Sequence, residues 1–485
     1  MKLSDPTLLK TDSFIEGKWQ PADSGQTFTV TNPANGSDIA SVADCGAAET
    51  EKAIQAANEA LPAWRAKTAK ERCNILKKWY QLIMENQEDL AIILSAEQGK
   101  PMAESRGEIA YGASFIEWFA EEAKRIYGDV IPGHAPDKRI VVIKQPIGVT
   151  AAITPWNFPN AMITRKVGPA LAAGCTMVVK PAEFTPLSAL AMAGLGDRAG
   201  IPAGVFSIVP TSTAADVGGV LTGSPIVRKL SFTGSTATGK LLMQQCANTV
   251  KKVSMELGGN APFIVFDDAD IDAAVAGAMM SKYRNSGQTC VCTNRFIVQD
   301  GVYDQFCTKL AAAAAKLKVG AADSGETDQG PLINQAAVDK VVSHIEDAVA
   351  NGARVVTGGA PHELGGLFYQ PTVLADVSPA MKVAKEETFG PVAPVFRFKE
   401  ESEGIAMANA TEFGLASYFY SRDINRVWRV AEALETGIVG INEGIISTEV
   451  APFGGIKESG VGREGSRYGI EDYLEVKYLC MGGVS

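Results

Sequence analysis

A cysteine in a glycine-containing turn is the residue of this sequence best suited to covalent chemistry. Cys290 ends the run Asn-Ser-Gly-Gln-Thr-Cys, and Cys292 follows two positions later. A free thiol has a pKa of about 8.5, so it needs a polarising environment to act as a nucleophile at neutral pH. Backbone N–H groups of the preceding turn could provide one. Cys290 is therefore a candidate nucleophile, although most free cysteines are simply small buried hydrophobic residues.

A carboxylate lies upstream, at the end of a predicted strand. Val253, Met255 and Leu257 alternate with Ser254 and Glu256, which is the period of a β-strand. Two glycines follow and leave room for a ligand to approach the carboxylate. A thiol nucleophile and a separate carboxylate base can together form an acyl-enzyme and hydrolyse it.

Other nucleophile and metal chemistries have few residues to work with. The chain has three histidines, His134, His344 and His362, which we expect on polar loops or helix surfaces. Its eight cysteines are scattered, and no second close Cys or His pair accompanies Cys290 and Cys292 to hold zinc. We therefore predict no metal site, and the base for the thiol must be a carboxylate, a lysine or water.

Three further segments follow predicted strands, where open α/β sheets bind ligands. Asn157, in a loop fixed by two prolines, could donate its amide N–H to an oxyanion, worth about 3 kcal/mol when preorganised. Gly234 and Ser235 precede a helix whose N-terminus would suit a pyrophosphate. Lys180 and Glu183 follow another strand, and such a glutamate can bind ribose hydroxyls and repel a 2′-phosphate.

The composition is that of a globular protein. The chain has 485 residues, 46% hydrophobic and 21% charged, and a net charge of −10 without a basic block, so nucleic acid is not an expected partner. The N-terminus has no apolar run, and no stretch reaches the roughly 18 apolar residues of a membrane span. We expect a cytoplasmic protein with no membrane partner.

The elements that must position these residues read as an α/β protein. Short strands at 149–153, 176–179, 205–209 and 229–232 alternate with helical stretches such as 161–173 and 186–199. A second series has strands near 262–266, 294–298, 353–356 and 392–398. This pattern predicts two doubly wound parallel-sheet domains joined near residues 258–259. Segment 138–145 is predicted to form one arm of a protruding hairpin, and 473–479 a strand that pairs outside its own domain.

Taken in order, the motifs resemble the NAD(P)-dependent aldehyde dehydrogenase superfamily over essentially the whole chain. Within it the chain is most similar to the succinate-semialdehyde dehydrogenase subfamily. The motifs are PWNFP, KPAEFTP, FTGSTATG, MELGGNAP, GQTC and EETFGPV, with AMITRKVGPALAAGCT and YRNSGQTCVCTNR for the subfamily.

The resemblance implies an aldehyde dehydrogenase-like fold with a small β oligomerisation arm. Residues 1–123 and 146–257 would form the coenzyme-binding domain, 258–470 the catalytic domain, and 124–145 with 471–485 the arm. A homo-oligomer, either a dimer or a tetramer, is expected.

The resemblance also implies residue roles. Cys290 would attack the aldehyde, Asn157 would stabilise the oxyanion, and Glu256 would activate water to hydrolyse the thioester. The implied coenzyme contacts are Lys180 and Glu183 at the adenosine ribose, Trp156, Gly234 and Ser235 at the pyrophosphate, and Glu387 and Phe389 at the nicotinamide.

The expected substrate is a small carboxylated aldehyde, succinate semialdehyde, oxidised to succinate. Arginine offers a planar fork to a carboxylate, and similarity to the subfamily makes Arg165, Arg284 and Ser447 the predicted carboxylate site. Glutarate semialdehyde, one methylene longer, and a broad range of aldehydes remain alternatives, because one methylene changes binding by only about 1–3 kcal/mol. A non-catalytic member would be expected to lack Cys290, Glu256 or Asn157, and all three are present.

Two finer expectations concern coenzyme and regulation. Glu183 would repel a 2′-phosphate, so we predict NAD as the preferred coenzyme, with NADP possible and Lys180 softening the discrimination. Cys292 is either a buried bystander or, as the subfamily resemblance suggests, the partner of Cys290 in a reversible disulfide switch.

Overall fold

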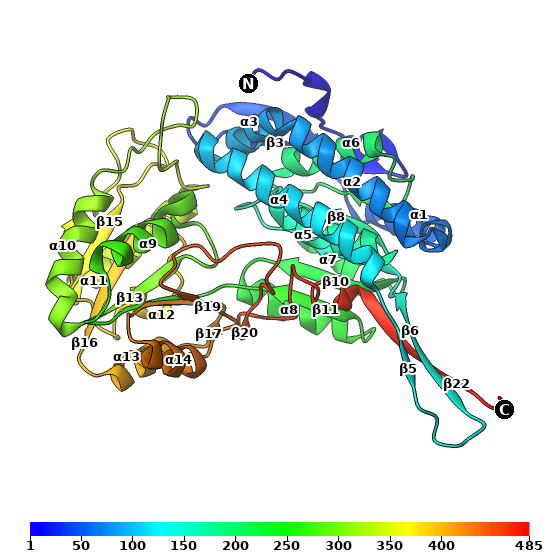
Figure 1. Ribbon diagram of the computed structural model, residues 1–485. Coiled ribbons are helices and arrows are strands. Elements are labelled where there is room, and N and C mark those ends of the chain that lie inside the picture. The colour runs from blue at the N-terminus through cyan, green and yellow to red at the C-terminus, as the bar shows by residue number, and fades with distance from the viewer. Residues whose placement is uncertain (485) are drawn as a thin grey trace.

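The computed structural model describes residues 1–484 and is built around two large sheets, each flanked by helices (Figure 1). In the first sheet, β9, β8, β7, β10 and β11 run parallel in that order, and β1, β2 and β21 add antiparallel edges. Its strands, in sheet order, are β2 (Lys18–Gln20), β1 (Ser13–Ile15), β9 (Phe206–Ile208), β8 (Thr176–Lys180), β7 (Val149–Ile153), β10 (Val227–Thr233), β11 (Lys252–Glu256) and β21 (Gly460–Val461).

The second sheet is parallel except at β14, which pairs antiparallel with β15. Its strands, in sheet order, are β14 (Arg354–Thr357), β15 (Thr372–Ala375), β16 (Val392–Phe398), β13 (Thr293–Gln299), β12 (Ala261–Val265), β18 (Ala416–Tyr420) and β19 (Ile438–Ile441). The predicted α/β class with two parallel-sheet layers is confirmed. The prediction that 353–356 continues the parallel series is wrong, because β14 is an edge strand that runs antiparallel to its neighbour β15.

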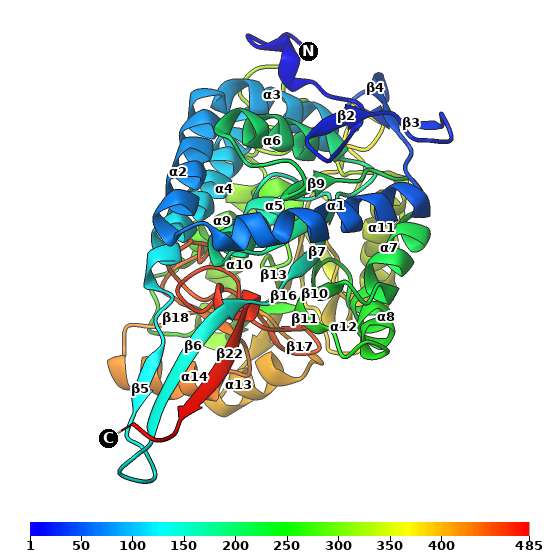
Figure 2. The ribbon, with the colours of Figure 1, turned by 90° about the vertical axis from the view of Figure 1, so that its right-hand side faces the viewer.

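Helices cover both sheets, and their ends follow local chemistry (Figures 1 and 2). Thr68 caps α2, since its hydroxyl accepts the N–H of Glu71 at 3.3 Å while the Glu71 carboxylate accepts the N–H of Thr68 at 2.7 Å. Gly99 ends α3 with φ +91°, a conformation that glycine adopts without strain. The helices are α1 (Ala47–Ala66), α2 (Ala69–Glu85), α3 (Gln87–Gln98), α4 (Met102–Glu122), α5 (Ala161–Ala173), α6 (Pro186–Ala199), α7 (Ala214–Gly223), α8 (Thr236–Ala247), α9 (Ile271–Tyr283), α10 (Tyr303–Ala314), α11 (Gln335–Ala350), α12 (Lys382–Lys385), α13 (Glu401–Asn409) and α14 (Ile424–Ala433).

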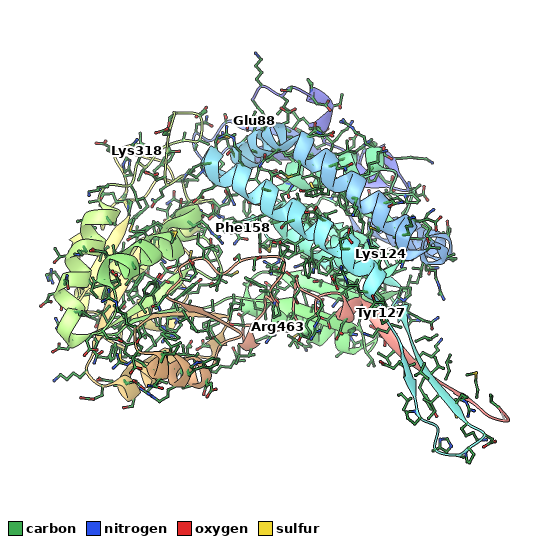
Figure 3. The ribbon with its side chains drawn as sticks, viewed as in Figure 1. Glu88, Lys124, Tyr127, Phe158, Lys318 and Arg463 are labelled. Atoms are coloured by element: carbon green, nitrogen blue, oxygen red, sulfur yellow. The ribbon has the colours of Figure 1, made fainter. Side chains whose placement is uncertain are left out.

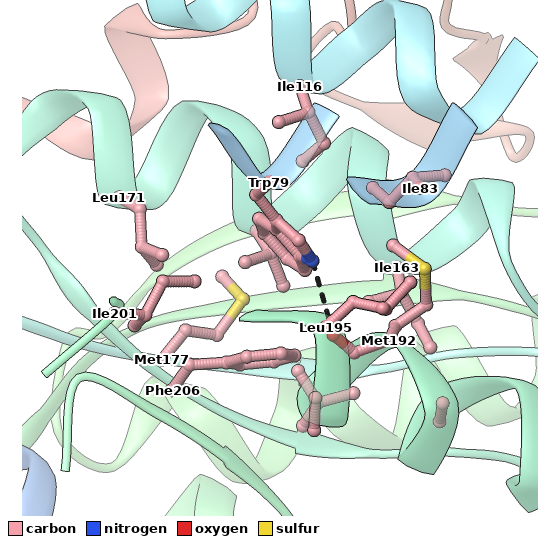
Figure 4. Close-up of a cluster of buried hydrophobic side chains, with 14 of the residues drawn as sticks. Trp79, Ile83, Ile116, Ile163, Leu171, Met177, Met192, Leu195, Ile201 and Phe206 are labelled. Carbon is pink, nitrogen blue, oxygen red and sulfur yellow. Dashed lines mark hydrogen bonds between the residues drawn. The ribbon is translucent and has the colours of Figure 1, made fainter. Parts of the chain in front are cut away.

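The core beside the first sheet is organised around Trp79 (Figure 4). Its ring is fully buried on α2, 5.6 Å from the ring centre of Phe206 on β9. The indole N–H donates to the carbonyl of Met192 on α6 at 3.2 Å, so no polar atom of the ring is left unpaired. Removing such a side chain costs about 3–5 kcal/mol. This packing fixes α2 and α6 against the sheet that carries the site.

A three-stranded arm projects from the body of the molecule and carries the C-terminal strand (Figures 1 and 2). β5 (Asp129–Ile131) and β6 (Arg139–Pro146) form the expected hairpin, and β22 (Leu474–Met481) pairs antiparallel with β6 along its whole length. Two small antiparallel pairs complete the strands: the hairpin of β3 (Thr27–Thr31) with β4 (Asp38–Ala43), and β17 (Phe413–Gly414) with β20 (Ile456–Lys457), which are distant in the sequence. Among the described residues no helix is long and apolar enough to cross a membrane.

One late strand of the chain returns to the first sheet. β21 lies within 258–470, the segment predicted to form the catalytic domain, yet it pairs with β11 of the first sheet through Met255–Val461 and Glu256–Gly460. The end of the strand that carries Glu256 is therefore held by a late part of the chain. The functional assignment of the domains stays a prediction.

Candidate active site

The predicted residues meet at a cavity of about 600 Å³ between the two sheets. Phe158, one of its lining residues, lies between the helices of the two halves (Figure 3). The predicted site residues that line the cavity are Trp156, Asn157, Arg165, Gly234, Ser235, Glu256, Arg284, Cys290, Glu387, Phe389 and Ser447. Lys180, Glu183 and Cys292 do not line it.

A left-handed stretch of backbone delivers Cys290 to the cavity. Asn285, Ser286 and Gly287 have φ of +51°, +57° and +76° in succession. A side chain on Gly287 would bring its Cβ to 2.1 Å from the carbonyl oxygen of Gly390, so only glycine fits there. A turn then closes, in which the N–H of Cys292 donates to the carbonyl of Thr289 at 2.9 Å.

Asn157 is fastened to the loop that carries the cysteine. Its side-chain Nδ2 donates to the backbone carbonyl of Gln288 at 3.0 Å. The backbone carbonyl of Asn157 in turn accepts a hydrogen bond from the side-chain Nδ2 of Asn285 at 3.0 Å. An amide nitrogen has two N–H groups, so the second can serve an oxyanion beside Cys290. Burial of Asn157, which is 6% exposed, keeps that donor in place.

A buried ion pair holds this arrangement from behind, and the sequence reasoning missed it. Lys100 Nζ lies 2.5 Å from Glu108, with both side chains fully buried, and also donates to the carbonyl of Asn157 at 2.7 Å. The other oxygen of Glu108 accepts the N–H groups of Asn160 and Ala161 at 2.9 and 3.2 Å, where α5 begins. The sequence Gly99-Lys100-Pro101 is typical of a surface turn. No local pattern therefore indicates that the Lys100 side chain is buried.

Glu256 is a buried carboxylate at the end of β11, 3% exposed. Among residues 1–484, neither of its oxygens has a hydrogen-bond partner. Burial, and then the nearby Glu464 carboxylate, raise the pKa of Glu256 well above its usual range. A carboxylate with a raised pKa is a stronger base than an ordinary one, which suits the activation of water.

A second buried ion pair, next to Glu256, was likewise not predicted from the sequence. Lys166 Nζ contacts Glu464 at 2.5 Å and Thr233 Oγ1 at 2.6 Å. Lys166 lies on α5 and Glu464 is 298 positions further along the chain, so only the fold brings them together.

The three predicted anion-binding residues line the cavity but differ in what already holds them. The guanidinium of Arg165 lies 2.7 Å from Glu464 and 4.0 Å from the ring centre of Phe453. Arg284 lies 5.2 Å from the ring centre of Phe158, makes no ion pair within 4 Å among residues 1–484, and acts on the Glu104 carboxylate only through a longer-range charge interaction. Ser447 is half-buried and adds a hydroxyl. Arg284 is therefore the cation that an anionic ligand could neutralise.

One side of the cavity combines a helix N-terminus with two aromatic rings. Ser235 caps α8, accepting the N–H of Thr238 at 3.3 Å, and the first turn of α8 has no acidic residue to oppose a phosphate. Trp156 and Phe389 meet edge to face at 5.6 Å. These groups could hold a pyrophosphate and a planar ring.

Two acidic residues flank that region. Glu387 accepts the N–H of Gly259 at 3.1 Å, and burial raises its pKa to about 7. The Glu183 carboxylate lies 3.5 Å from the Lys180 ammonium group. Lys180 is the last residue of β8, and its backbone carbonyl accepts the N–H of Thr154 at 3.1 Å. The pair therefore sits at the same sheet edge as the 154–158 loop, where a ribose could be bound.

The expectation that all three histidines are solvated is wrong for His344. On α11 it is buried, with Nδ1 3.1 Å from Thr388 Oγ1 and Nε2 3.2 Å from Glu386. Burial lowers its pKa below the ordinary value. It packs behind the 387–389 segment and does not line the cavity. Within the described residues, no group of three or more His, Cys, Asp or Glu side chains is arranged to hold a metal ion.

Residues 19–479 match the aldehyde dehydrogenase family, and the chain belongs to that family. It is an NAD(P)-dependent aldehyde dehydrogenase by descent and by fold.

Its relatives carry names for several anionic aldehydes. The chain is 68% identical to glutarate-semialdehyde dehydrogenase of Pseudomonas aeruginosa, over 100% of both chains. It is 67% identical to succinate-semialdehyde dehydrogenase [NADP(+)] of Escherichia coli, over 99% of this chain and 100% of that one. It is 65% identical to 3-sulfolactaldehyde dehydrogenase of Pseudomonas putida, over 100% and 99%. The crystal structure of succinate-semialdehyde dehydrogenase from Burkholderia pseudomallei superposes with a TM-score of 0.98, at 64% identity over 99% and 100%.

Proposed function

We propose that this protein oxidises succinate semialdehyde to succinate with NAD. The observation that supports this most directly is Arg284, which lines the same cavity as Cys290 and Glu256 and makes no ion pair within 4 Å among residues 1–484. An aldehyde with a terminal carboxylate would supply the missing negative charge while its carbonyl carbon reaches the thiol.

The first step is attack of the Cys290 sulfur on the aldehyde carbon. Burial raises the pKa of this thiol to about 12, so its proton must pass to a water molecule in the cavity as the C–S bond forms. The oxyanion of the resulting thiohemiacetal accepts hydrogen bonds from the Asn157 amide and the backbone N–H of Cys290.

The coenzyme would be held by residues on the other side of the cavity. Lys180 and Glu183 bind the adenosine ribose, Trp156, Gly234 and Ser235 the pyrophosphate, and Glu387 and Phe389 the nicotinamide ribose and ring. When bound, the coenzyme supplies the acceptor for the hydride that leaves the substrate carbon, and a thioester to Cys290 remains.

Hydrolysis completes the reaction. Glu256 takes a proton from a water molecule as that water attacks the thioester carbon, and the C–S bond then breaks to return the thiolate. The buried Lys166–Glu464 pair interacts with Glu256 through its charges and would influence how readily Glu256 releases this proton.

Glutarate semialdehyde is the second candidate substrate. The names of relatives at 65–68% identity include glutarate semialdehyde and a sulfonated aldehyde as well as succinate semialdehyde. All three have an anionic group remote from the aldehyde, so a pocket built on arginine suits each of them.

The coenzyme preference rests on Glu183 alone. A 2′-phosphate beside this carboxylate would meet like-charge repulsion, while its ion pair with Lys180 at 3.5 Å reduces the effect. One relative is named for NADP, and a betaine aldehyde dehydrogenase structure of the same family holds NAD+. Replacing Glu183 by Ala should raise kcat/KM for NADP relative to NAD, and an unchanged ratio would refute this assignment.

The substrate assignment is tested with Arg284→Ala. Loss of a buried charge partner costs about 2–5 kcal/mol, so kcat/KM for succinate semialdehyde should fall at least about 30-fold. The value for butanal, which has no carboxylate, should change by less than about threefold. Arg106→Ala is the matched control, because Arg106 pairs with Glu88 on the surface and does not line the cavity. Equal losses for both aldehydes would contradict the assignment.

Cys292 is proposed as the partner of Cys290 in a redox switch. Its thiol is buried and points to the carbonyl of Lys282 at 3.5 Å. Peroxide would oxidise Cys290 to a sulfenic acid, which condenses with the Cys292 thiol to a disulfide and releases water. Peroxide should therefore inactivate the enzyme reversibly, with dithiothreitol restoring it. If the Cys292→Ala protein is restored as fully, the switch does not exist.

A further inference from the structure

One face of α4 forms a wall of the cavity. Glu104, Gly107, Glu108 and Tyr111 all line it, at the spacing of a single helical face. Three of these positions are filled by side chains with defined contacts. Gly107 alone on this face contributes no side chain, so the wall is recessed at that point.

The recess has no packing reason within the protein. A Cβ placed on Gly107 meets no atom within 4 Å, whereas one placed on Gly112 of the same helix would lie 2.4 Å from Asn160 Oδ1. Gly112 is therefore required for packing against the start of α5, and Gly107 is not. Glycine inside a helix is destabilising relative to alanine, so α4 carries a stability cost at Gly107 that its own contacts do not explain.

Gly107 lies between the two arginines of the predicted carboxylate site. One turn before it, the Glu104 carboxylate accepts the N–H of Asn285, the residue after Arg284, at 2.9 and 3.1 Å. One turn after it, the Tyr111 hydroxyl lies 3.5 Å from Arg165 Nη1. The recess therefore faces the part of the cavity where the substrate tail would lie.

We propose that the recess at Gly107 sets the length of the substrate tail and admits the longer, five-carbon semialdehyde. This inference rests on the proposed function, because it assumes that a carboxylated tail lies between Arg165 and Arg284. A side chain at position 107 would occupy the space that an additional methylene needs, while a four-carbon substrate would still fit.

The test is a graded series, Gly107→Ala and Gly107→Val, measured with glutarate semialdehyde, succinate semialdehyde, pentanal and propanal. The ratio of kcat/KM for glutarate to succinate semialdehyde should fall about tenfold in Gly107→Ala and further in Gly107→Val, because one methylene in a pocket discriminates by about 10–200-fold. An unchanged ratio in both variants, with activity on succinate semialdehyde retained, would overturn the inference.

Gly219→Ala is the matched control. Gly219 lies inside α7, a Cβ there also meets nothing within 4 Å, and it does not line the cavity. Both alanine variants should raise Tm, but only Gly107→Ala should change the selectivity. The wild-type protein tests the proposed function separately. If the wild type has a higher kcat/KM for propanal than for both semialdehydes, the proposed carboxylate site is wrong. If the Gly107 variants also leave the ratio of kcat/KM for pentanal to propanal unchanged, the recess does not set the length of the substrate tail either.

Discussion

Glu256 lies in an environment that disfavours its ionised side chain. A buried carboxylate without hydrogen-bond partners among the described residues is energetically unfavourable, and its raised pKa reflects that cost. A cost of this kind at the end of a cavity-facing strand is typical of a catalytic base.

Replacing Glu256 by Gln should separate the two halves of the reaction. Acylation should still produce one equivalent of reduced coenzyme per site, but kcat should fall about 10²–10⁴-fold because water is no longer activated. Stopped-flow absorbance of the reduced coenzyme measures both quantities. Loss of the initial burst together with kcat would instead assign Glu256 to the attack of Cys290.

The pH dependence of thermal stability tests the raised pKa of Glu256 independently of catalysis. Because the pKa of Glu256 is raised by folding, the folded state binds more protons, and stability falls as the pH rises from the unfolded value of 4.5 through the folded value. The Gln variant lacks this loss, so its Tm should exceed that of the wild type at pH 8 by more than at pH 5. Thermal unfolding measures Tm at the two pH values. An equal difference in Tm between the variant and the wild type at pH 5 and pH 8 would contradict the raised pKa of Glu256.

At the residue scale, local patterns predict the cavity side chains well. Cys290, Glu256 and Asn157 each follow a strand or turn signal, and the structure brings them to one cavity. The Lys166–Glu464 pair could not be predicted in this way, because its residues lie 298 positions apart and only the tertiary fold joins them. Lys100 and Glu108 are eight positions apart, but no local pattern indicates that both side chains are buried.

The elements that surround the site were predicted unevenly for a physical reason. The strands β7 and β8 are fully buried apolar runs next to the well-marked helices α5 and α6, and all four elements agree with the expected ranges. β15, β18 and β19 have similar lengths, 4 or 5 residues, but their sequences do not stand out from the neighbouring loops. The left-handed turn before Cys290 was not expected either, since Asn and Ser carry two of its three positive φ angles.

The C-terminal strand β22 gives the prediction that belongs to the element scale. Its side chains are exposed from Glu475 onward, and an exposed strand at a sheet edge is open to pairing with another chain. A protein truncated before Leu474 should therefore lose the homo-oligomer that we expect of the full chain. Light scattering coupled to size-exclusion chromatography measures this directly.

A chain ending at Met481 is the control, because it keeps the whole of β22. It should retain the mass of the full-length oligomer. An unchanged assembly in the shorter truncation would show that the arm plays no part in subunit contacts.

For the whole molecule, the central feature is the cavity between two sheets that each contribute part of the chemistry. The first sheet supplies Glu256 and the loop of Asn157, and the second half of the chain supplies Cys290, Arg284 and Glu387. β21 ties the two together by pairing with the strand of Glu256. The relative position of the sheets therefore decides whether thiol, base and anion site act on one substrate.

The most direct test of this account is a matrix of initial rates for the wild-type protein. Succinate semialdehyde, glutarate semialdehyde and butanal would each be measured with NAD and with NADP, following formation of the reduced coenzyme. We predict the highest kcat/KM for succinate semialdehyde with NAD, with both semialdehydes well above butanal. A preference for butanal would contradict the arginine site, and equal rates with NADP would contradict the role of Glu183.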